Sequence, residues 1–443
     1  MKIKISKKNF IISCAIGAVL GTILFAAIKN ALAPDSVKIA FYNLSENQIE
    51  TNKQESKKFT ERKISYKFTT IDSESAFAKT DVDLIFTNMG ATADKMSESI
   101  PAKKRRKTYL NSKVLAGSSI SAAKKARVDS NKIVQVPLLF DGYELLLSTE
   151  SLRKTNTQSI NGWNEFETYA QKARESYRMP LVFAGKDADT FLAVITVLTE
   201  SFGGMEDCLK AQEMILDYTG DDYNALVKKL VSSQGPLHET CRRLKKWIND
   251  GIISPEVLRL SKSAVISLAE HHHMASFIIP LSEHRNFSDE ASRKFTTIPI
   301  SSDEQLTFIP SNRPLNTRSI VSQVICAVPM TKNRNVSFFV SHLTRENAQE
   351  RISNLTGLAP MHARCHVPDI YSDDVRFWIA ASQVPTTPLG DSAFTSQQKK
   401  RHLQTVLETT FLKTNFFLLS GDRKKKSWVF PGFFIKLILL QHA

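Results

Sequence analysis

Short stretches of alternating apolar and polar residues recur along most of this chain, separated by segments whose apolar residues lie three or four positions apart. Alternation is typical of strands, and the wider spacing places side chains on one face of a helix. The pattern predicts strands at 37–42, 64–68, 82–86, 134–138, 143–147, 179–184, 274–279, 295–300 and 324–328. It predicts helices at 163–177, 191–202, 223–230, 237–248, 336–352, 374–382 and 397–411. Strands that alternate with helices favour the α/β class, with largely parallel sheets.

The start of the chain has a different pattern, an apolar run at 10–28 without a charge. Four lysines precede the run and a single Lys29 follows it, which favours a cytoplasmic amino end and an exported body. Three interpretations of residues 1–33 stay open. The run is long enough for an uncleaved membrane anchor, Ala33 ends a small-residue cleavage site for a secretory signal, and Cys14 follows a lipobox-like stretch. Each predicts a periplasmic or otherwise extracytoplasmic protein, tethered to the inner membrane in the anchored and lipoprotein forms.

Composition narrows the class of protein. Hydrophobic residues make up 42 % of the 443 residues and charged residues 23 %, which is typical of a chain that folds around ordinary cores. The formal net charge is +15, and five lysines in 1–33 account for part of it. Basic runs at 103–107 and 423–426 carry much of the excess. Because no nucleic-acid-binding module accompanies them, contact with solvent or anionic lipid is the preferred interpretation, and no nucleic-acid partner is predicted.

The five cysteines form no Cys-x-x-Cys pair. Export makes a disulfide chemically feasible, and Cys208 with Cys241 is the best candidate pair because the two bracket predicted helices. Scattered buried thiols are an equally good interpretation, and the spacing does not decide between them.

Several segments, taken in order, resemble the extracellular solute-binding proteins of bacterial ABC importers, in particular the sugar-binding family that includes maltose-binding protein. Residues 136–145 (VPLLFDGYEL) are similar to the strand that crosses between lobes in that family, and 161–166 (NGWNEF) to its "TWdEF" helix start. Further similar segments are 244–255 and the following strand at 271–278, the segment 325–329 with the helix at 333–351, and the turn TGLAP at 356–360. The resemblance covers roughly residues 36–412.

The resemblance implies a two-lobed periplasmic-binding-protein fold of type II, with hinge-connected lobes that close on a solute. Lobe one is expected to take 35–139 and 281–328, and lobe two 140–280 and 329–412. Residues 413–443 are expected to be a basic and apolar tail. The chain would cross between the lobes three times.

Candidate ligand-binding residues come from two arguments. Thr87 and Asn88 end a predicted strand, where the crevice of an open α/β sheet is expected. The resemblance places the other candidates at the crossover, in the returning segment and in a region where relatives present an aromatic ring to the solute: Asp141, Tyr143, Asn312, Arg313 and Trp378.

The main hypothesis is a binding component that captures a carbohydrate or similar polar solute and delivers it to ABC permease subunits. The alternative is a surface or adhesion protein that keeps the fold without transport, and a third hypothesis is an exported hydrolase. No phosphate loop, nucleophile elbow or zinc-protease motif is present, so no enzyme activity and no cofactor are predicted. The triplet 271–273 (HHH) invites a metal interpretation, but adjacent residues do not all point to one centre, and no metal site is predicted.

Overall fold

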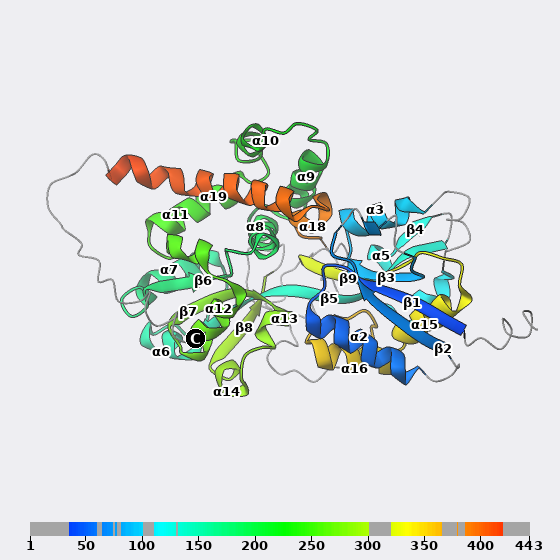
Figure 1. Ribbon diagram of the computed structural model, residues 1–443. Helices are drawn as coiled ribbons and strands as arrows, with labels where there is room; N and C mark the ends of the chain where they lie inside the picture. Colours follow the sequence, from blue (N-terminus) through cyan, green and yellow to red (C-terminus); the bar gives the residue numbers. More distant parts are fainter. Residues whose placement is uncertain are drawn as a thin grey trace, which may run out of the picture.

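The computed structural model describes residues 35–59, 64–73, 76–77, 81–100, 110–129, 132–300, 320–365, 379 and 386–419. These residues form two lobes that share one strand, β5 (Figure 1). The expected leader 1–33 with Cys14, the basic runs, residues 420–443 and all of the helix expected at 374–382 except Ile379 lie outside the described residues. Within the described residues, no helix has the length and the apolar character that crossing a membrane requires.

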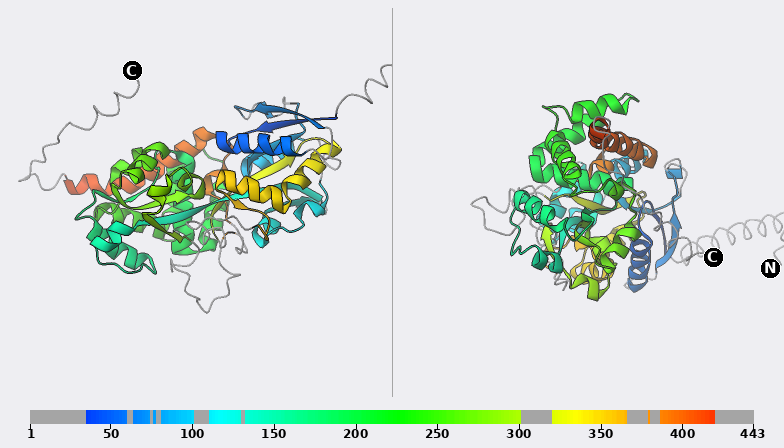
Figure 2. Two further views of the ribbon diagram at one scale, coloured as in Figure 1. Left: turned by 90° about the horizontal axis from the view of Figure 1, so that it is seen from below. Right: turned by 90° about the vertical axis from the view of Figure 1, so that its left-hand side faces the viewer.

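Lobe one is built on β1 (Asp35–Phe41), β2 (Ile64–Thr70), β3 (Leu84–Asn88), β9 (Ser322–Pro329) and the first part of β5 (Lys132–Ser148). β1 pairs in parallel with β2 and β3, whereas β9 pairs antiparallel with both β3 and β5. The smaller elements are α2 (Glu46–Lys58), α3 (Ala91–Ser99), η2 (Ser112–Leu115), α5 (Ile120–Lys125), β4 (Arg127–Asp129), α15 (Arg334–Leu343), α16 (Glu346–Thr356) and β10 (Ala359–Pro360). α2 and α16 lie side by side on one face (Figure 2).

Lobe two is built on the second part of β5 with β6 (Met179–Val182), β7 (Met274–Pro280) and β8 (Phe295–Pro299). β7 and β8 both pair antiparallel with β5, and β6 pairs in parallel with β7. Its helices are α6 (Thr149–Lys154), α7 (Trp163–Ala173), α8 (Ala188–Gly203), α9 (Met205–Leu216), α10 (Tyr223–Leu230), α11 (His238–Asn249), η3 (Pro255–Arg259), α12 (Lys262–Glu270), α13 (Leu281–His284), α14 (Asp289–Ser292), α18 (Leu389–Ala393) and α19 (Gln397–Leu419).

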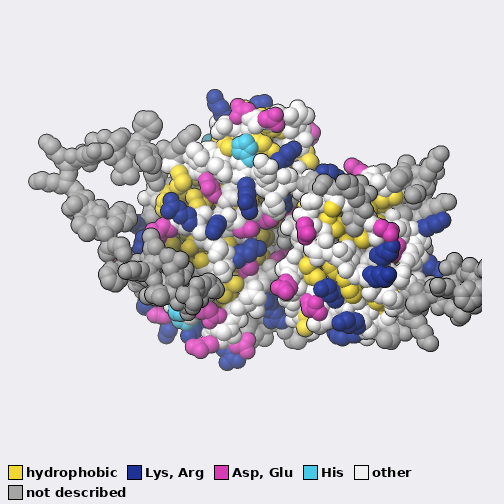
Figure 3. Space-filling view, viewed as in Figure 1, with side chains coloured by type: hydrophobic (Ala, Val, Ile, Leu, Met, Phe, Trp, Pro, Cys, Tyr) yellow, Lys and Arg dark blue, Asp and Glu magenta, His cyan; other side chains and the backbone are white. Residues whose placement is uncertain are grey.

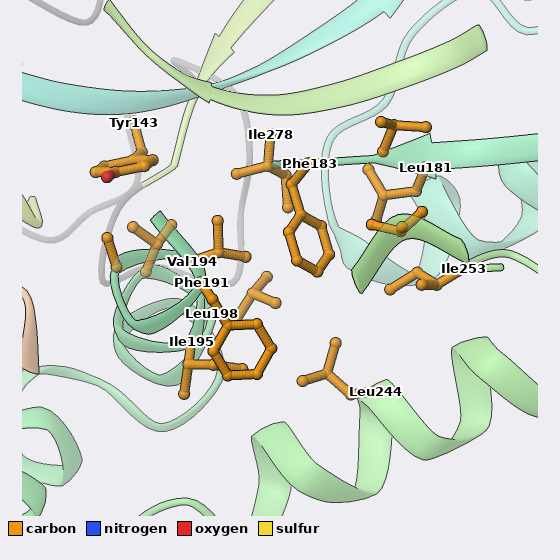
Figure 4. Close-up of a cluster of buried hydrophobic side chains, with 14 of the residues drawn as sticks. Tyr143, Leu181, Phe183, Phe191, Val194, Ile195, Leu198, Leu244, Ile253 and Ile278 are labelled. Carbon is orange, nitrogen blue, oxygen red and sulfur yellow. The ribbon is translucent and has the colours of Figure 1, made fainter. Parts of the chain in front are cut away.

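The core of lobe two surrounds α8, which is apolar on almost every side and therefore buried along its length. Its side chains pack against the sheet residues Tyr143 and Ile278 on one side and against Leu244 of α11 on another (Figure 4). Trp163 and Trp247, with ring centroids 5.5 Å apart, add an aromatic centre to the same core. The core of lobe one is separate and includes Phe41, Phe86, Phe140 and Phe339.

β5 is the physical link between these two cores. Its residues up to Phe140 pack in the core of lobe one, and those from Tyr143 onward pack in the core of lobe two. The sequence pattern predicts two strands with a loop at 140–142, but the backbone stays extended through Asp141 and Gly142. Pairing with β9 as far as Gly142, and with β7 from Tyr143, gives this stretch hydrogen-bonding partners on both sides of the crossover.

The returning segments pack differently from the expected division. Phe295 and Ile298 of β8 belong to the core of lobe two, because β8 pairs with the lobe-two part of β5. Val336 of α15 and Ile352 of α16 belong to the core of lobe one. Leu281 of α13 does pack in the core of lobe one, but Phe287 returns to that of lobe two. The later changes of core fall between Ile300 and Ile320 and between Ile379 and Leu389, and not at 328–329.

Two further expectations are corrected, and the alternative left open for Cys208 and Cys241 is answered. The sheet is mixed rather than largely parallel, because β5, β7, β8 and β9 run antiparallel to their neighbours at the crossover. The single helix expected at 336–352 is two helices, α15 and α16. Cys208 and Cys241 are free buried thiols, and the Cys208 Sγ lies 3.3 Å from the Thr196 carbonyl oxygen.

Candidate functional site

In lobe one, the polar residues that end β3 are held beside the crossover. Thr87 and Asn88 pair with Cys326 and Ile325 of β9, and β9 pairs in turn with β5. Asn88 is 6 % exposed, and its Nδ2 donates to the Asn43 carbonyl oxygen at 3.3 Å. The Thr87 hydroxyl is fully buried and has no hydrogen-bond partner among the described residues. The end of β3 therefore presents a neutral amide and a neutral hydroxyl.

At the crossover, Asp141 connects β5 to the short helix α13. Its two carboxylate oxygens accept from the Ser282 backbone N–H at 3.1 Å and from the Ser282 hydroxyl at 2.5 Å. Burial raises the pKa of this carboxyl to about 6, although the hydrogen bonds from Ser282 act to lower it. Three residues further along β5, the fully buried Glu144 contacts His284 of α13. Both acidic residues thus fix α13 against the strand that links the lobes.

Lobe two places charged residues at the ends of its own strands. Asp187 follows β6 and caps the amino end of α8, and Glu283 follows β7. Lys262, at the start of α12, places its Nζ 3.1 Å from the Glu283 Oε1. We call Asp141, Asp187, Lys262 and Glu283 the interlobe charge cluster. Crevices of open α/β sheets form at the carboxyl ends of strands, so the position suits a binding site.

The interlobe charge cluster contains three carboxyl groups and one amine, and this excess of acids contributes to the pKa shifts. Burial raises the pKa of Glu283, and Lys262 offsets only part of that effect. Burial acts to lower the pKa of Lys262, but Glu283, Asp187 and Asp141 together hold it above its usual value. The pKa of Tyr143 is raised well above its ordinary value by burial and by the neighbouring carboxylates, so this phenol stays neutral. On the face shown in Figure 3, acidic and basic side chains mix around the junction of the lobes.

A direct contact between the lobes lies next to the end of β3. Gly90 has φ +125°, and a Cβ there would lie 2.2 Å from the Asp391 carbonyl oxygen of α18. The Asp391 carboxylate accepts from the Gln323 Nε2 of β9 at 2.8 Å and from the Lys400 Nζ of α19 at 2.9 Å. α18 is packed on α8 and α9 of lobe two, so this contact ties it to lobe one.

No family model and no curated protein matches the sequence. Solved structures do match, among them a chitin oligosaccharide binding protein with 12 % identity, which covers 88 % of this chain and 100 % of its own at a TM-score of 0.60. A putative binding protein of Bacillus subtilis in an open conformation has 12 % identity, 86 % and 93 % coverage and a TM-score of 0.62. A maltose-bound protein of T. maritima has 14 % identity, 86 % and 99 % coverage and a TM-score of 0.58.

This chain has the two-lobed solute-binding-protein fold. Within that fold, four of the residues predicted from sequence lie on neighbouring strands: Thr87 and Asn88 on β3, and Asp141 and Tyr143 on β5, with β9 between the two strands. Asp141 and Tyr143 are 4 % and 6 % exposed, and Asp141 is engaged by Ser282, so both also serve the hinge and the core. The other three predicted residues, Asn312, Arg313 and Trp378, lie outside the described residues.

Sequence reasoning missed Asp187, Lys262 and Glu283. The signal for the two acids was present, because they follow the predicted strands at 179–184 and 274–279 just as Thr87 ends its strand. The strand-end argument predicted residues only after the strand at 82–86, in lobe one. Lys262 carried no comparable signal, since it lies next to Glu283 only through the packing of α12 on α13.

The histidine triplet is used at a surface turn. His271 ends α12 and His272 has φ +55°. The His272 Nε2 lies 2.8 Å from the Lys294 Nζ, and the rings of His271 and His273 stack with centroids 6.0 Å apart. Over the described ranges, no group of three or more His, Cys, Asp or Glu residues is placed to bind a metal ion.

Proposed function

We propose that this protein is the substrate-binding component of an ABC importer, which captures a carbohydrate or similar polar solute between its lobes. The observation that carries the proposal is β5, one continuous strand shared by two separate cores, with polar strand ends from both lobes beside the crossover. A strand that belongs to both lobes gives a hinge about which they can rotate, and a ligand that contacts both lobes favours the closed arrangement.

The chemistry of the site supports a reversible binding role. Asn88 and Thr87 offer the planar amide and the hydroxyl that satisfy sugar hydroxyls, and Tyr143 adds an aromatic ring at the crossover. Structurally similar proteins include a chitin oligosaccharide binding protein, a maltose-bound protein and a protein in complex with raffinose. By this proposal the protein carries out no covalent chemistry and passes its solute to permease subunits.

We propose an extracytoplasmic location, with residues 1–33 holding the protein at the inner membrane. The lysine-rich, apolar start of the chain supports this, and one neighbour is described as a secreted solute-binding lipoprotein. Membrane fractionation of the full chain and of a form without 1–33 tests it, because only the full chain should sediment with the membrane.

A thermal-shift screen with oligosaccharides, followed by calorimetric titration of each hit, tests the binding function. A bound solute at about 100 times its Kd should stabilise the protein by about 2.7 kcal/mol, so the melting temperature should rise saturably. Asn88→Ala should weaken binding of the hit about tenfold, the effect of losing a buried hydrogen bond. Glu150→Gln is the matched control, because Glu150 is an exposed residue of α6 that pairs with Lys154. If no saccharide changes the melting temperature, the proposal is wrong and the adhesion alternative is favoured.

A further inference from the structure

The carboxylates of the interlobe charge cluster are unequally satisfied. Asp141 accepts two hydrogen bonds from Ser282, and the Asp187 Oδ1 accepts from the Thr190 backbone N–H at 2.9 Å. Glu283 is only 4 % exposed, yet its Oε2 has no hydrogen-bond partner among the residues that the structure describes. A buried charged oxygen without a donor is costly, so this atom is a place where a ligand can supply one.

The charge of the cluster sets the kind of donor. The cluster has one ammonium group, that of Lys262, which pairs with Glu283 at 3.1 Å and whose pKa Asp187 and Asp141 also act to raise. With all four groups ionised, the cluster carries an excess of two negative charges. A neutral hydroxyl could satisfy the Glu283 Oε2 but would leave this charge unbalanced, whereas a second ammonium group brings three donors and a positive charge.

The neighbouring groups favour a cationic ligand over another anion. The carboxylates of Asp141 and Glu283 both act on the Tyr143 phenol, so all three groups lie in one region, and an ammonium group is attracted to these carboxylates. The end of β3, on the other lobe, contributes Thr87 and Asn88, which are neutral and suited to hydroxyls. A solute with hydroxyls at one end and an amine at the other matches this asymmetry.

We propose that the solute carries a protonated amine, held against Glu283 and Asp187 of lobe two while its hydroxyls contact the end of β3. This inference rests on the proposed function and names the substrate class of the same site, an amino-bearing saccharide. The raised pKa of Glu283, which burial causes, agrees with a carboxylate that lacks a full counter-charge before the ligand arrives.

Matched ligands test the inference. Glucosamine oligomers and N-acetylglucosamine oligomers of equal length differ in the amine alone, and spermidine carries amines without a sugar. Each is titrated calorimetrically at neutral pH into the full-length protein. We expect the glucosamine oligomer to bind about tenfold more tightly than its acetylated partner, the usual effect of a hydrogen bond to a charged group.

Two variants with opposite expected signs separate recognition from structure. Glu283→Gln should weaken binding of the amine about tenfold and leave the acetylated oligomer unchanged. Lys262→Gln should strengthen binding of the amine severalfold, because the internal cation that competes for Glu283 is removed. Glu150→Gln should change neither affinity. If Glu283→Gln fails to fold, Asp187→Asn replaces it, since asparagine preserves the cap of α8.

Each outcome decides between the proposals. Equal or tighter binding of the acetylated oligomer overturns the amine inference and leaves the carbohydrate function intact. Binding of spermidine without either saccharide supports amine recognition and overturns the carbohydrate function. Binding of none of the three overturns the amine inference, and the wider saccharide screen then judges the proposed function separately. A loss of affinity for both oligomers in Glu283→Gln would indicate a structural role and contradict the inference.

Discussion

Each lobe buries a carboxylate, Glu55 in lobe one and Glu283 in lobe two, and the two have different hydrogen-bond and ion-pair partners. Glu55 of α2 is 2 % exposed and accepts from the His342 Nε2 at 3.0 Å and from the Arg351 Nε at 3.1 Å. Glu283 is 4 % exposed and has Lys262 as its ion-pair partner. Burial acts to raise both pKa values, but His342 and Arg351 hold the pKa of Glu55 below its usual value, whereas that of Glu283 stays raised.

The contrast separates a structural ion cluster from a site. In lobe one, the Arg351 guanidinium balances the charge of Glu55, and the contacts of Glu55 with His342 and Arg351 tie α2 to α15 and α16. In lobe two, the acids lie at the strand ends beside the crossover and outnumber the bases. Burial alone therefore does not distinguish a structural carboxylate from one in a binding site. The number of cations and donors around the carboxylate does.

The largest expected effect is on the lobe-one cluster. Glu55→Gln should lower the free energy of unfolding by about 3 kcal/mol at neutral pH, because it leaves the Arg351 guanidinium without its carboxylate partner. A lowered pKa stabilises the fold above the unfolded value of 4.5, and that stabilisation is lost as pH falls toward the folded pKa. Urea unfolding at neutral and acidic pH measures this, with Glu150→Gln as the exposed control. A deficit that stayed equal at low pH would contradict the comparison.

The next effect has the opposite pH dependence. Burial raises the pKa of Asp141 from its ordinary value of 3.8 to about 6 in the folded protein, so the folded state holds the proton of this carboxyl more tightly. Its contribution to stability should therefore fall by about 2 kcal/mol as pH rises from about 4 to about 7. Asp141→Asn should remove this component and still accept the Ser282 N–H. Denaturation curves of wild type and Asp141→Asn at several pH values measure this. The prediction is refuted if the free energy of unfolding changes with pH equally in the two proteins.

The smallest expected effect concerns the contact between the two lobes. Gly90→Ala should cost about 1 to 2 kcal/mol through backbone strain and should separate α18 from the end of β3. Gly204→Ala is the matched control, because Gly204 also has positive φ but nothing within 4 Å of its missing Cβ. Chemical denaturation should show a similar loss of unfolding free energy in both variants. Small-angle scattering should show a larger radius of gyration for Gly90→Ala alone, and equal radii would mean that the contact does not hold the lobes together.

Much of the architecture could be predicted from local pattern. The strands at 64–68 and 274–279 and the helices at 223–230 and 397–411 were expected because their periodicity reflects one buried face. The continuous course of β5 could not be predicted, since Asp141-Gly142 resembles a turn and only pairing with β9 and β7 keeps it extended. The expected placement of 281–328 in lobe one does not hold for β8, for the same reason. β8 belongs to lobe two because it pairs with β5 over a long distance in the sequence.

The candidate site divides along the same line. Thr87 and Asn88 were found from the end of a strand, a property visible in the sequence, and Asp187 and Glu283 could have been found by the same rule. The pKa of Glu55 is lowered and that of Glu283 is raised because different side chains fold against the two acids. The partners of Glu55 come from helices far away in the sequence, whereas Lys262, the partner of Glu283, is close in the sequence. The sequence alone predicted most of the helices and strands and the strand-end polar residues, because these depend on neighbours in the chain. Only the tertiary structure decided which lobe each segment joins and which partners face each buried carboxylate, because pairing and desolvation depend on neighbours in space.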